Sequence, residues 1–224
     1  MVTTLVVSES SARRYALGDP DVRLMLQVRD GDAVAFEELV LRYQQRLVVV
    51  LDHLVGSRDL AEDLAQEVFL RVYRARERYV AGAKFATWLF TIANNVASNA
   101  LRSRSRRREV TWQPRDGGMT DTRPLDSMAQ ASSSQMPARQ LDKAEMRDIV
   151  KIAIGALNER QRMAVLLNKF EGMSYADIAI AMELTPQAIK SLLSRARGNL
   201  REVLEPYLQN GQHPDVDNET PGDQ

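Results

Sequence analysis

Apolar residues recur along most of this chain at spacings of three and four, the pattern of an amphipathic α-helix. Between residues 33 and 55, for example, Phe36, Val40 and Tyr43 mark one narrow apolar stripe suited to packing on another helix. No segment alternates like a strand over a convincing length. The same reasoning predicts helices over residues 20–30, 33–55, 58–78, 85–108, 140–157, 158–171, 174–182 and 185–208.

Three segments lack this periodicity and separate or flank the predicted helices. Residues 109–139 are rich in Ser, Gly, Pro, Asp and Gln, a composition that predicts a flexible linker. Residues 1–19 are predicted to be a loose polar arm, and residues 209–224 a disordered acidic tail. The predicted fold class is therefore all-α, with two small helical domains, 20–108 and 140–208, joined by a flexible linker.

The C-terminal domain contains a short helix, a tight turn and a cationic second helix. Ser174 can cap the first helix, with Asp177 three residues later in the capping-box position. Thr185 is a strong N-cap for the second helix, and Pro186 suits its first position. No acidic residue occurs between Thr185 and Arg201. This arrangement predicts a DNA-binding helix-turn-helix, and its alternative is an ordinary helix pair with a solvated basic face.

The predicted helix at 58–78 is acidic in its first half and basic in its second half. That order of charge complements the helix dipole, which explains it without any partner. A partner-binding face is the functional alternative, and the exposed Leu70 would then supply an apolar contact among charges. The acidic and amide residues of this face are Asp59, Glu62, Asp63, Gln66 and Glu67.

The predicted helix at 85–108 carries short polar side chains along one side and arginines at its end. Asparagine is a poor interior helix former, so these side chains either face water or hydrogen-bond to bases. The arginines exceed what dipole complementation and solubility require, which favours contact with phosphates. The polar residues are Asn94, Asn95, Ser98 and Asn99, and the arginines are Arg102, Arg104, Arg106, Arg107 and Arg108.

Composition narrows the function mainly by exclusion. The 224 residues include 30 Lys plus Arg and 30 Asp plus Glu, so only local clustering of charge can indicate nucleic acid. The absence of cysteine excludes disulfides, thiolate zinc ligands and thiol catalysis, and fits a reducing cytoplasm. No metal-ligand cluster, nucleophile–base pair or cofactor loop is evident, so we expect no enzyme activity, metal or cofactor. Neither a signal peptide nor a membrane span is predicted.

Two stretches, in this order across a polar linker, resemble bacterial RNA polymerase sigma factors of the extracytoplasmic-function (ECF) type in the sigma-70 family. The first is RDLAEDLAQEVFLRVYRARERY followed by FATWLFTIANNVASNALRSRSRRR. The second is LNERQRMAVLLNKFEGMSYADIAIAMELTPQAIKSLLSRARGNLREVL. The resemblance covers roughly residues 20–108 and 140–206. It implies a cytoplasmic transcription initiation factor that directs core RNA polymerase to promoters and helps to melt them.

The resemblance also implies partners and site residues. Residues 20–108 would be sigma region 2 and residues 140–208 sigma region 4, with core polymerase, promoter DNA and an anti-sigma factor as partners and no membrane insertion. The core-polymerase-binding residues would be Asp59, Asp63, Gln66, Glu67 and Leu70. The −10 DNA-binding residues would be Tyr79, Lys84, Phe85, Trp88, Asn95, Asn99, Arg102 and Arg106. The −35 DNA-binding residues would be Thr185, Gln187, Lys190, Ser191, Ser194, Arg195 and Arg197.

The sequence departs from the family pattern at three places. Glu183 occupies a turn position where relatives often have glycine, which implies strain of about 1 kcal/mol if the turn needs a positive φ. Leu192 replaces a basic residue that many members have in the recognition helix, and the loop 79–84 lacks an acidic or second basic residue. A two-domain helix-turn-helix regulator that is not a polymerase subunit is the alternative, although it leaves the polar and basic features of residues 94–108 unexplained.

Overall fold

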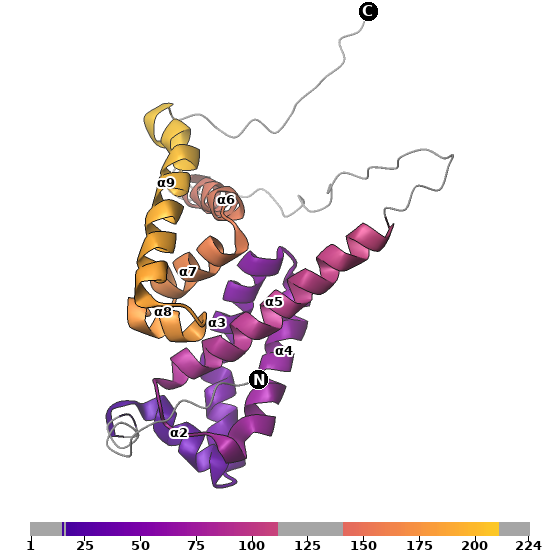
Figure 1. Cartoon of the computed structure of the whole chain (residues 1–224), viewed down its shortest axis with the longest axis vertical. Helices are drawn as coiled ribbons and strands as arrows, with labels where there is room; N and C mark the ends of the chain where they lie inside the picture. Colours follow the sequence, from indigo (N-terminus) through magenta and orange to yellow (C-terminus); the bar gives the residue numbers. More distant parts are fainter. Residues whose placement is uncertain (1–14, 16, 112–140, 211–224) are drawn as a thin grey trace, which may run out of the picture.

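The computed structural model describes residues 15, 17–111 and 141–210, and the regular structure of these residues is entirely helical (Figure 1). This confirms the predicted all-α class. Most of the predicted linker and tail lie outside the described residues. The boundaries differ slightly from the prediction, because the fifth helix continues to Thr111 and the last helix ends at Asn210.

The N-terminal half is built around one long central helix, α3, which packs against its neighbours on several sides. The polar Asp19, Asp32 and Ser57 side chains cap α2, α3 and α4 by accepting backbone N–H bonds. Gly56 ends α3 at φ 69°, a left-handed conformation that glycine adopts without strain. The helices are α2 (Pro20–Arg29), α3 (Ala33–Val55), α4 (Arg58–Ala75), a short 3₁₀ helix η1 (Arg76–Arg78) and α5 (Phe85–Thr111).

The end of the predicted N-terminal arm is helical where it is described. Tyr15, Leu17 and Gly18 have helical backbone, and the Asp19 amide donates to the Tyr15 carbonyl at 2.9 Å. The Arg23 guanidinium also donates to the Leu17 carbonyl at 2.9 Å. A turn of helix therefore precedes α2, whereas the sequence predicted a loose arm up to residue 19; residues 1–14 and 16 lie outside the described residues.

The C-terminal half contains the predicted helix-turn-helix, formed by α8 and α9, supported by two further helices. Asn158 and Gln161 form a reciprocal capping box at the start of α7. The Ser174 hydroxyl accepts the Asp177 N–H, and the Thr185 hydroxyl accepts the Ala188 N–H at 3.2 Å, so both predicted caps are present. The helices are α6 (Leu141–Gly155), α7 (Glu159–Lys169), α8 (Tyr175–Ala181) and α9 (Pro186–Asn210).

The turn between α8 and α9 forces Glu183 into left-handed backbone at φ 54°. The Glu183 N–H donates to the Ile180 carbonyl at 3.2 Å, and the Leu184 N–H donates to the Ala179 carbonyl at 2.9 Å. These two bonds form a Schellman motif, in which the residue at this position is usually glycine. The positive φ considered from the sequence is therefore confirmed.

The two halves pack directly against each other, although the sequence predicted only two domains and a linker. Helix α8 lies against α5, and α7 lies against α3 (Figure 1). The buried apolar residues of both halves form one continuous cluster. The Arg162 guanidinium on α7 donates to carbonyls at the end of α6 and also to those of His53 and Leu54, at 3.3 Å each, at the end of α3.

Candidate functional site

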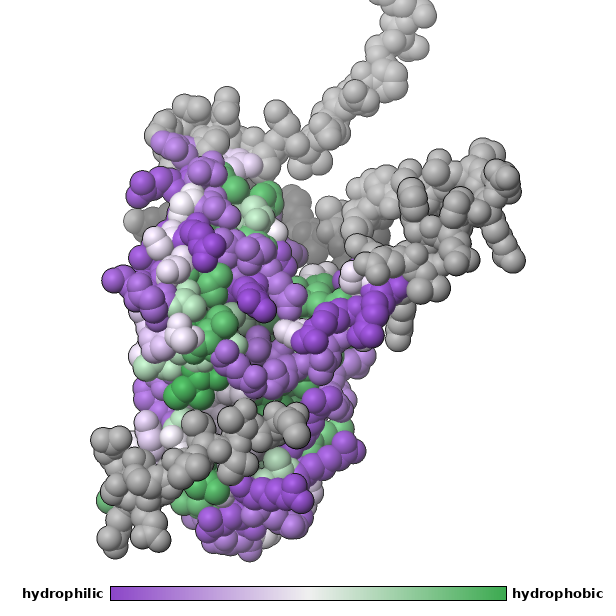
Figure 2. Space-filling model, viewed as in Figure 1, coloured by the Kyte–Doolittle hydropathy of each residue, from purple (hydrophilic) through white to green (hydrophobic). Residues whose placement is uncertain are grey.

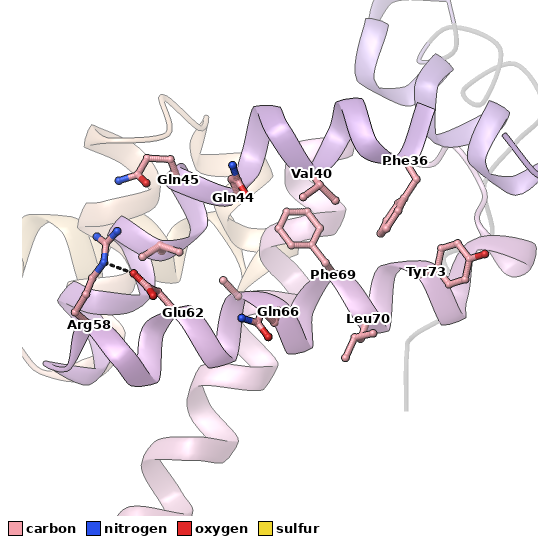
Figure 3. Close-up of a pocket in the computed structure, with 12 residues that line it drawn as sticks. Phe36, Val40, Gln44, Gln45, Arg58, Glu62, Gln66, Phe69, Leu70 and Tyr73 are labelled. Atoms are coloured by element: carbon pink, nitrogen blue, oxygen red, sulfur yellow. Dashed lines mark hydrogen bonds and ion pairs between the residues drawn. The ribbon is translucent and has the colours of Figure 1, made fainter. Parts of the chain in front are cut away.

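A groove of about 840 Å³ runs between α3 and α4 on the face of the molecule formed by these two helices (Figure 3). Aromatic side chains gather in it: the Phe36 ring lies 5.1 Å from that of Tyr73 and 6.4 Å from that of Phe69, centroid to centroid. Val40 lies beside them on α3. Because Tyr73 keeps 44% of its surface exposed, the groove offers apolar area to a partner.

The predicted core-polymerase-binding residues lie on α4, along and beside this groove. Asp59, Asp63 and Gln66 are exposed and Glu67 is half-buried, and Gln66 and Leu70 line the groove. Leu70 keeps 51% of its surface exposed although it is a large apolar residue. The five predicted residues therefore share one helix face that is accessible to a partner.

Some of the acidic charge on α4 is already neutralised within the helix. Glu62 pairs with Arg58 at 2.8 Å, and Glu67 pairs with Arg71 at 2.7 Å. Both are i,i+4 pairs between exposed groups, which contribute only a few tenths of a kcal/mol to stability. Within the described part of the chain, Asp63 has no ion pair, which leaves its carboxylate available to a cationic partner.

Two of the predicted −10 DNA-binding residues lie in the core. Phe85 is fully buried and Tyr79 is 3% exposed, so neither side chain presents a surface to DNA in this structure. Tyr79 packs against the half-buried Trp88 ring at 4.8 Å, and burial raises the pKa of the Tyr79 hydroxyl. No hydrogen-bond partner for that hydroxyl is present among the described residues. The loop after η1 folds inward because its first residue, the aromatic Tyr79, packs in the core.

Apart from the half-buried Trp88, the remaining predicted −10 residues are exposed, and four of them follow one another along α5. Asn95, Asn99, Arg102 and Arg106 are all exposed, and hydrophilic surface covers the outer end of this helix (Figure 2). Lys84 precedes α5, and its ammonium group lies 3.2 Å from the Asp177 carboxylate of the C-terminal half. An amide row followed by guanidinium groups can hydrogen-bond to bases and phosphates, respectively.

All seven predicted −35 residues lie on the exposed side of α9 or at its cap. Its apolar side, with Ile189, Leu193 and Ala196, packs against the core of the C-terminal half. The guanidinium of Arg197 donates to the Tyr175 hydroxyl at 2.9 Å, which links the two helices of the motif. The exposed predicted residues are Thr185, Gln187, Lys190, Ser191, Ser194, Arg195 and Arg197.

His53 marks the junction of the two halves at the end of α3. Its ring lies 5.6 Å from the Phe170 ring, which belongs to the C-terminal half. Burial lowers the pKa of His53, with smaller opposing and supporting effects from Asp52, Lys151 and Arg162. The sequence alone could not indicate this contact, because Phe170 is distant from His53 in the sequence.

Among the described residues, no group of three or more His, Asp or Glu side chains is placed to hold a metal ion. Within the same part of the chain, no helix is both long and apolar enough to cross a membrane.

Comparison with known proteins identifies both halves. Residues 39–107 match sigma-70 region 2, and residues 147–200 match sigma-70 region 4. The chain is 34% identical to the RNA polymerase sigma-H factor of Pseudomonas aeruginosa over 193 residues, which cover 85% of this chain and 97% of that protein. It is 31% identical to the ECF RNA polymerase sigma-E factor of Escherichia coli K12, over 84% of this chain and 96% of that protein.

Two solved structures are similar over most of the fold. The sigma factor RpoE of Bartonella quintana, in complex with the anti-sigma factor NepR, superposes with a TM-score of 0.58 at 27% identity, covering 76% of this chain and 96% of that chain. CnrH, in complex with the cytosolic domain of CnrY, has the same TM-score at 22% identity, over 84% of this chain and 98% of that one, and shows the shared fold.

These matches define a class of protein, the sigma-70 transcription initiation factors with regions 2 and 4. The chain belongs to the extracytoplasmic-function sigma factors of RNA polymerase. Proteins of this family are initiation factors rather than enzymes.

Proposed function

We propose that three surfaces of this chain carry the three binding functions of a sigma factor. The groove between α3 and α4 binds core RNA polymerase, the exposed side of α5 contacts the −10 promoter region, and α9 contacts the −35 element. The protein itself supplies binding free energy and no catalytic group, and it acts in the cytoplasm with the polymerase and the chromosome. The main support for this proposal is that sigma-70 region 2 and region 4 occur in this order on one chain.

The groove supports polymerase binding because it combines apolar area with charge. Leu70 and Tyr73 leave apolar surface exposed, and Asp63 lies on the same helix with no ion pair among the described residues. Interfaces are anchored by such aromatic and apolar centres with charged groups at the rim. A helical segment of the polymerase with basic residues fits this surface, and Phe36 and Val40 of α3 would complete its contact.

The exposed side of α5 supports contact with the −10 region. Asn95 and Asn99 are one helical turn apart and both exposed, so their amides can reach the edges of unstacked bases. Arg102 and Arg106 continue at the same spacing toward the end of the described helix, where guanidinium groups would meet the phosphate backbone. Tyr79 and Phe85 would act by supporting the loop and the start of α5 from beneath.

An anti-sigma factor is proposed as the regulatory partner. The similar Bartonella quintana structure contains such a protein bound to its sigma factor. The groove between α3 and α4 is an apolar surface that an inhibitor could cover to exclude the polymerase.

The decisive experiment is transcription reconstituted from purified bacterial core polymerase and this protein. A library of genomic fragments is transcribed, and the 5′ ends of the products are sequenced to find promoters that require the protein. We expect transcripts sharing −35 and −10 sequences. A helix-turn-helix regulator that is no polymerase subunit would bind DNA but would neither form a complex with core polymerase nor support initiation by core alone, and that outcome would refute the proposal.

A further inference from the structure

One carboxylate, that of Asp19, accepts hydrogen bonds from the starts of two different helices. Its Oδ1 atom accepts the Asp21 N–H at 2.9 Å, and this bond caps α2. Its Oδ2 atom accepts the N–H of Phe85, the first residue of α5, at 3.1 Å. Phe85 lies 66 positions after Asp19 in the sequence, so the partner of this α5 amide comes from a distant part of the chain.

The start of α5 needs an acceptor from outside because the residue before the helix is Lys84, whose ammonium group only donates hydrogen bonds. The first amide groups of a helix have no partner within it, and an anionic acceptor there also complements the helix dipole. By contrast, the side chain directly before the helix provides the cap of α2, α3, α4, α7, α8 and α9. Asp19 therefore takes the place of a local cap for α5.

Asp19 also lies close to the loop 79–84, which joins η1 to α5. At the first residue of this loop, burial and, secondly, the negative charge of Asp19 raise the pKa of the Tyr79 hydroxyl. At the other end, the bond to Phe85 holds the residue that follows the loop. The loop contains no helix or strand, and Val80 keeps 58% of its surface exposed. The position of the loop therefore depends largely on how its two ends are held.

A second contact joins the same two helix starts. The Tyr43 hydroxyl on α3 donates to the Asp21 carboxylate at 2.6 Å, and the Tyr43 ring packs against the Phe85 ring at 5.2 Å between centroids. Phe85 is fully buried, so its ring and its amide are both fixed against the part of the fold formed by α2 and α3. The start of α5 is thus placed by these two helices rather than by a cap of its own.

We propose that Asp19 is a positioning residue for −10 recognition, because it holds the loop 79–84 and the first turn of α5 in the place from which they meet promoter DNA. This inference rests on the proposed contact of α5 with the −10 region. Asp19 is half-buried and does not line the groove between α3 and α4, so this role is separate from the binding of core polymerase. The end of the N-terminal arm, which the sequence predicted to be loose, thereby serves the promoter-binding surface.

The test uses variants that keep a cap for α2 but remove one of the two acceptor oxygens. D19N and D19S each retain one side-chain oxygen, and asparagine and serine are as good as aspartate at an N-cap. D32N is the matched control, because both amides that bind Asp32 share its Oδ1 atom, so asparagine can keep both bonds while the charge is removed. Urea unfolding shows whether each variant is folded.

Each variant is assembled with core polymerase and tested on two fluorescent single-stranded DNA oligonucleotides. One carries the −10 sequence found by the transcription experiment, and the other carries the same bases in scrambled order. We expect D19N and D19S to lower the preference for the −10 oligonucleotide about 5-fold, as the loss of one helix cap would give. D32N should change this preference less than about 2-fold, because an exposed charge is screened. Binding to core polymerase should be the same in all three variants.

Two results would overturn the inference. The first is an equal preference for the −10 oligonucleotide in D19N, D19S and D32N. The second is a loss of binding by the same factor for both oligonucleotides, in step with the loss of folded protein, because a purely structural role would give that result.

A second measurement reports on the loop directly, without DNA or polymerase. Trp88 packs against the Tyr79 ring at 4.8 Å and the Phe85 ring at 6.1 Å, centroid to centroid. The chain has two tryptophans, so W112F leaves Trp88 as the fluorescent reporter. Acrylamide should quench this fluorescence more strongly when D19N is added to W112F than when D32N is added, and equal quenching would contradict the inference. Failure of the proposed function is recognised separately, because the natural chain would then yield no promoter-dependent product in reconstituted transcription.

Discussion

Replacing Glu183 by glycine should stabilise the protein. Glu183 has φ 54° in the turn between α8 and α9, while the other described residues with positive φ are Gly31, Gly56 and Gly172. A side chain in left-handed backbone costs about 1–2 kcal/mol. Glycine avoids that cost but gains freedom in the unfolded chain worth about 0.5–1 kcal/mol. The expected net gain is therefore about 0.5–1 kcal/mol.

The gain can be measured by urea unfolding of the full chain, followed by far-UV circular dichroism. For a chain of this size, 1 kcal/mol corresponds to a rise in Tm of about 2–4 °C. E183A is the matched control, because it removes the same exposed carboxylate but keeps the strained Cβ. E183N should lie between the two, since asparagine tolerates this backbone better than alanine.

The reasoning would be refuted if E183G were no more stable than E183A. That result would mean that the turn relaxes to a different conformation at little cost, or that the glutamate makes a favourable interaction in the folded state. If the free energy of unfolding rose equally in E183G and E183A, the gain would come from removal of the charge.

Three further predictions concern the proposed surfaces and their junction. Charge reversal at Asp63 and Glu67 should weaken binding to core polymerase at least about 10-fold, measured by fluorescence anisotropy. Charge reversal at Glu37, which is exposed and lies outside the groove, should leave this binding unchanged. Normal binding by the double variant, or its unfolding, would contradict the prediction. N95A should lower open-complex formation by about 1–3 kcal/mol on a duplex promoter, measured by permanganate footprinting, with unchanged thermal stability. If open-complex formation fell only in step with thermal stability, Asn95 would have a packing role instead. The free energy of unfolding should fall as the pH drops below about 6.5, because the depressed pKa of His53 favours the neutral ring in the folded state and protonation then favours unfolding. H53N should remove that part of the pH dependence, measured by urea unfolding between about pH 5 and pH 7.5; an unchanged slope would place its origin in other groups.

The helices and their caps could be predicted from the sequence because they depend on local interactions. The capping box of Asn158 and Gln161, the cap at Thr185 and the strained turn at Glu183 are each fixed by residues a few positions apart. The exposed face of α4 was also predictable, since the charges on one side of an amphipathic helix must face water.

The packing between the halves and the burial of individual aromatics could not be predicted. The family resemblance implies DNA contact by Tyr79 and Phe85, but the burial of these side chains depends on the helices that surround them. Phe36 indicated an apolar stripe, and the sequence did not show that it would line an open groove. The pairing of Lys84 with Asp177 joins residues 93 positions apart, for which a single sequence carries no signal.

The position of Arg162 has a consequence for how the two halves come to pack together. Its guanidinium is already held by the carbonyls of Ile154, Gly155 and Leu157 within the C-terminal half. At the contact between the halves, the same group also donates to the carbonyls of His53 and Leu54. A long side chain normally loses about 1.5–2 kcal/mol of rotamer freedom when it is fixed. Here the carbonyls of its own half hold the guanidinium in the position that meets the end of α3, so we expect part of that loss to belong to the folding of the C-terminal half rather than to the contact between the halves.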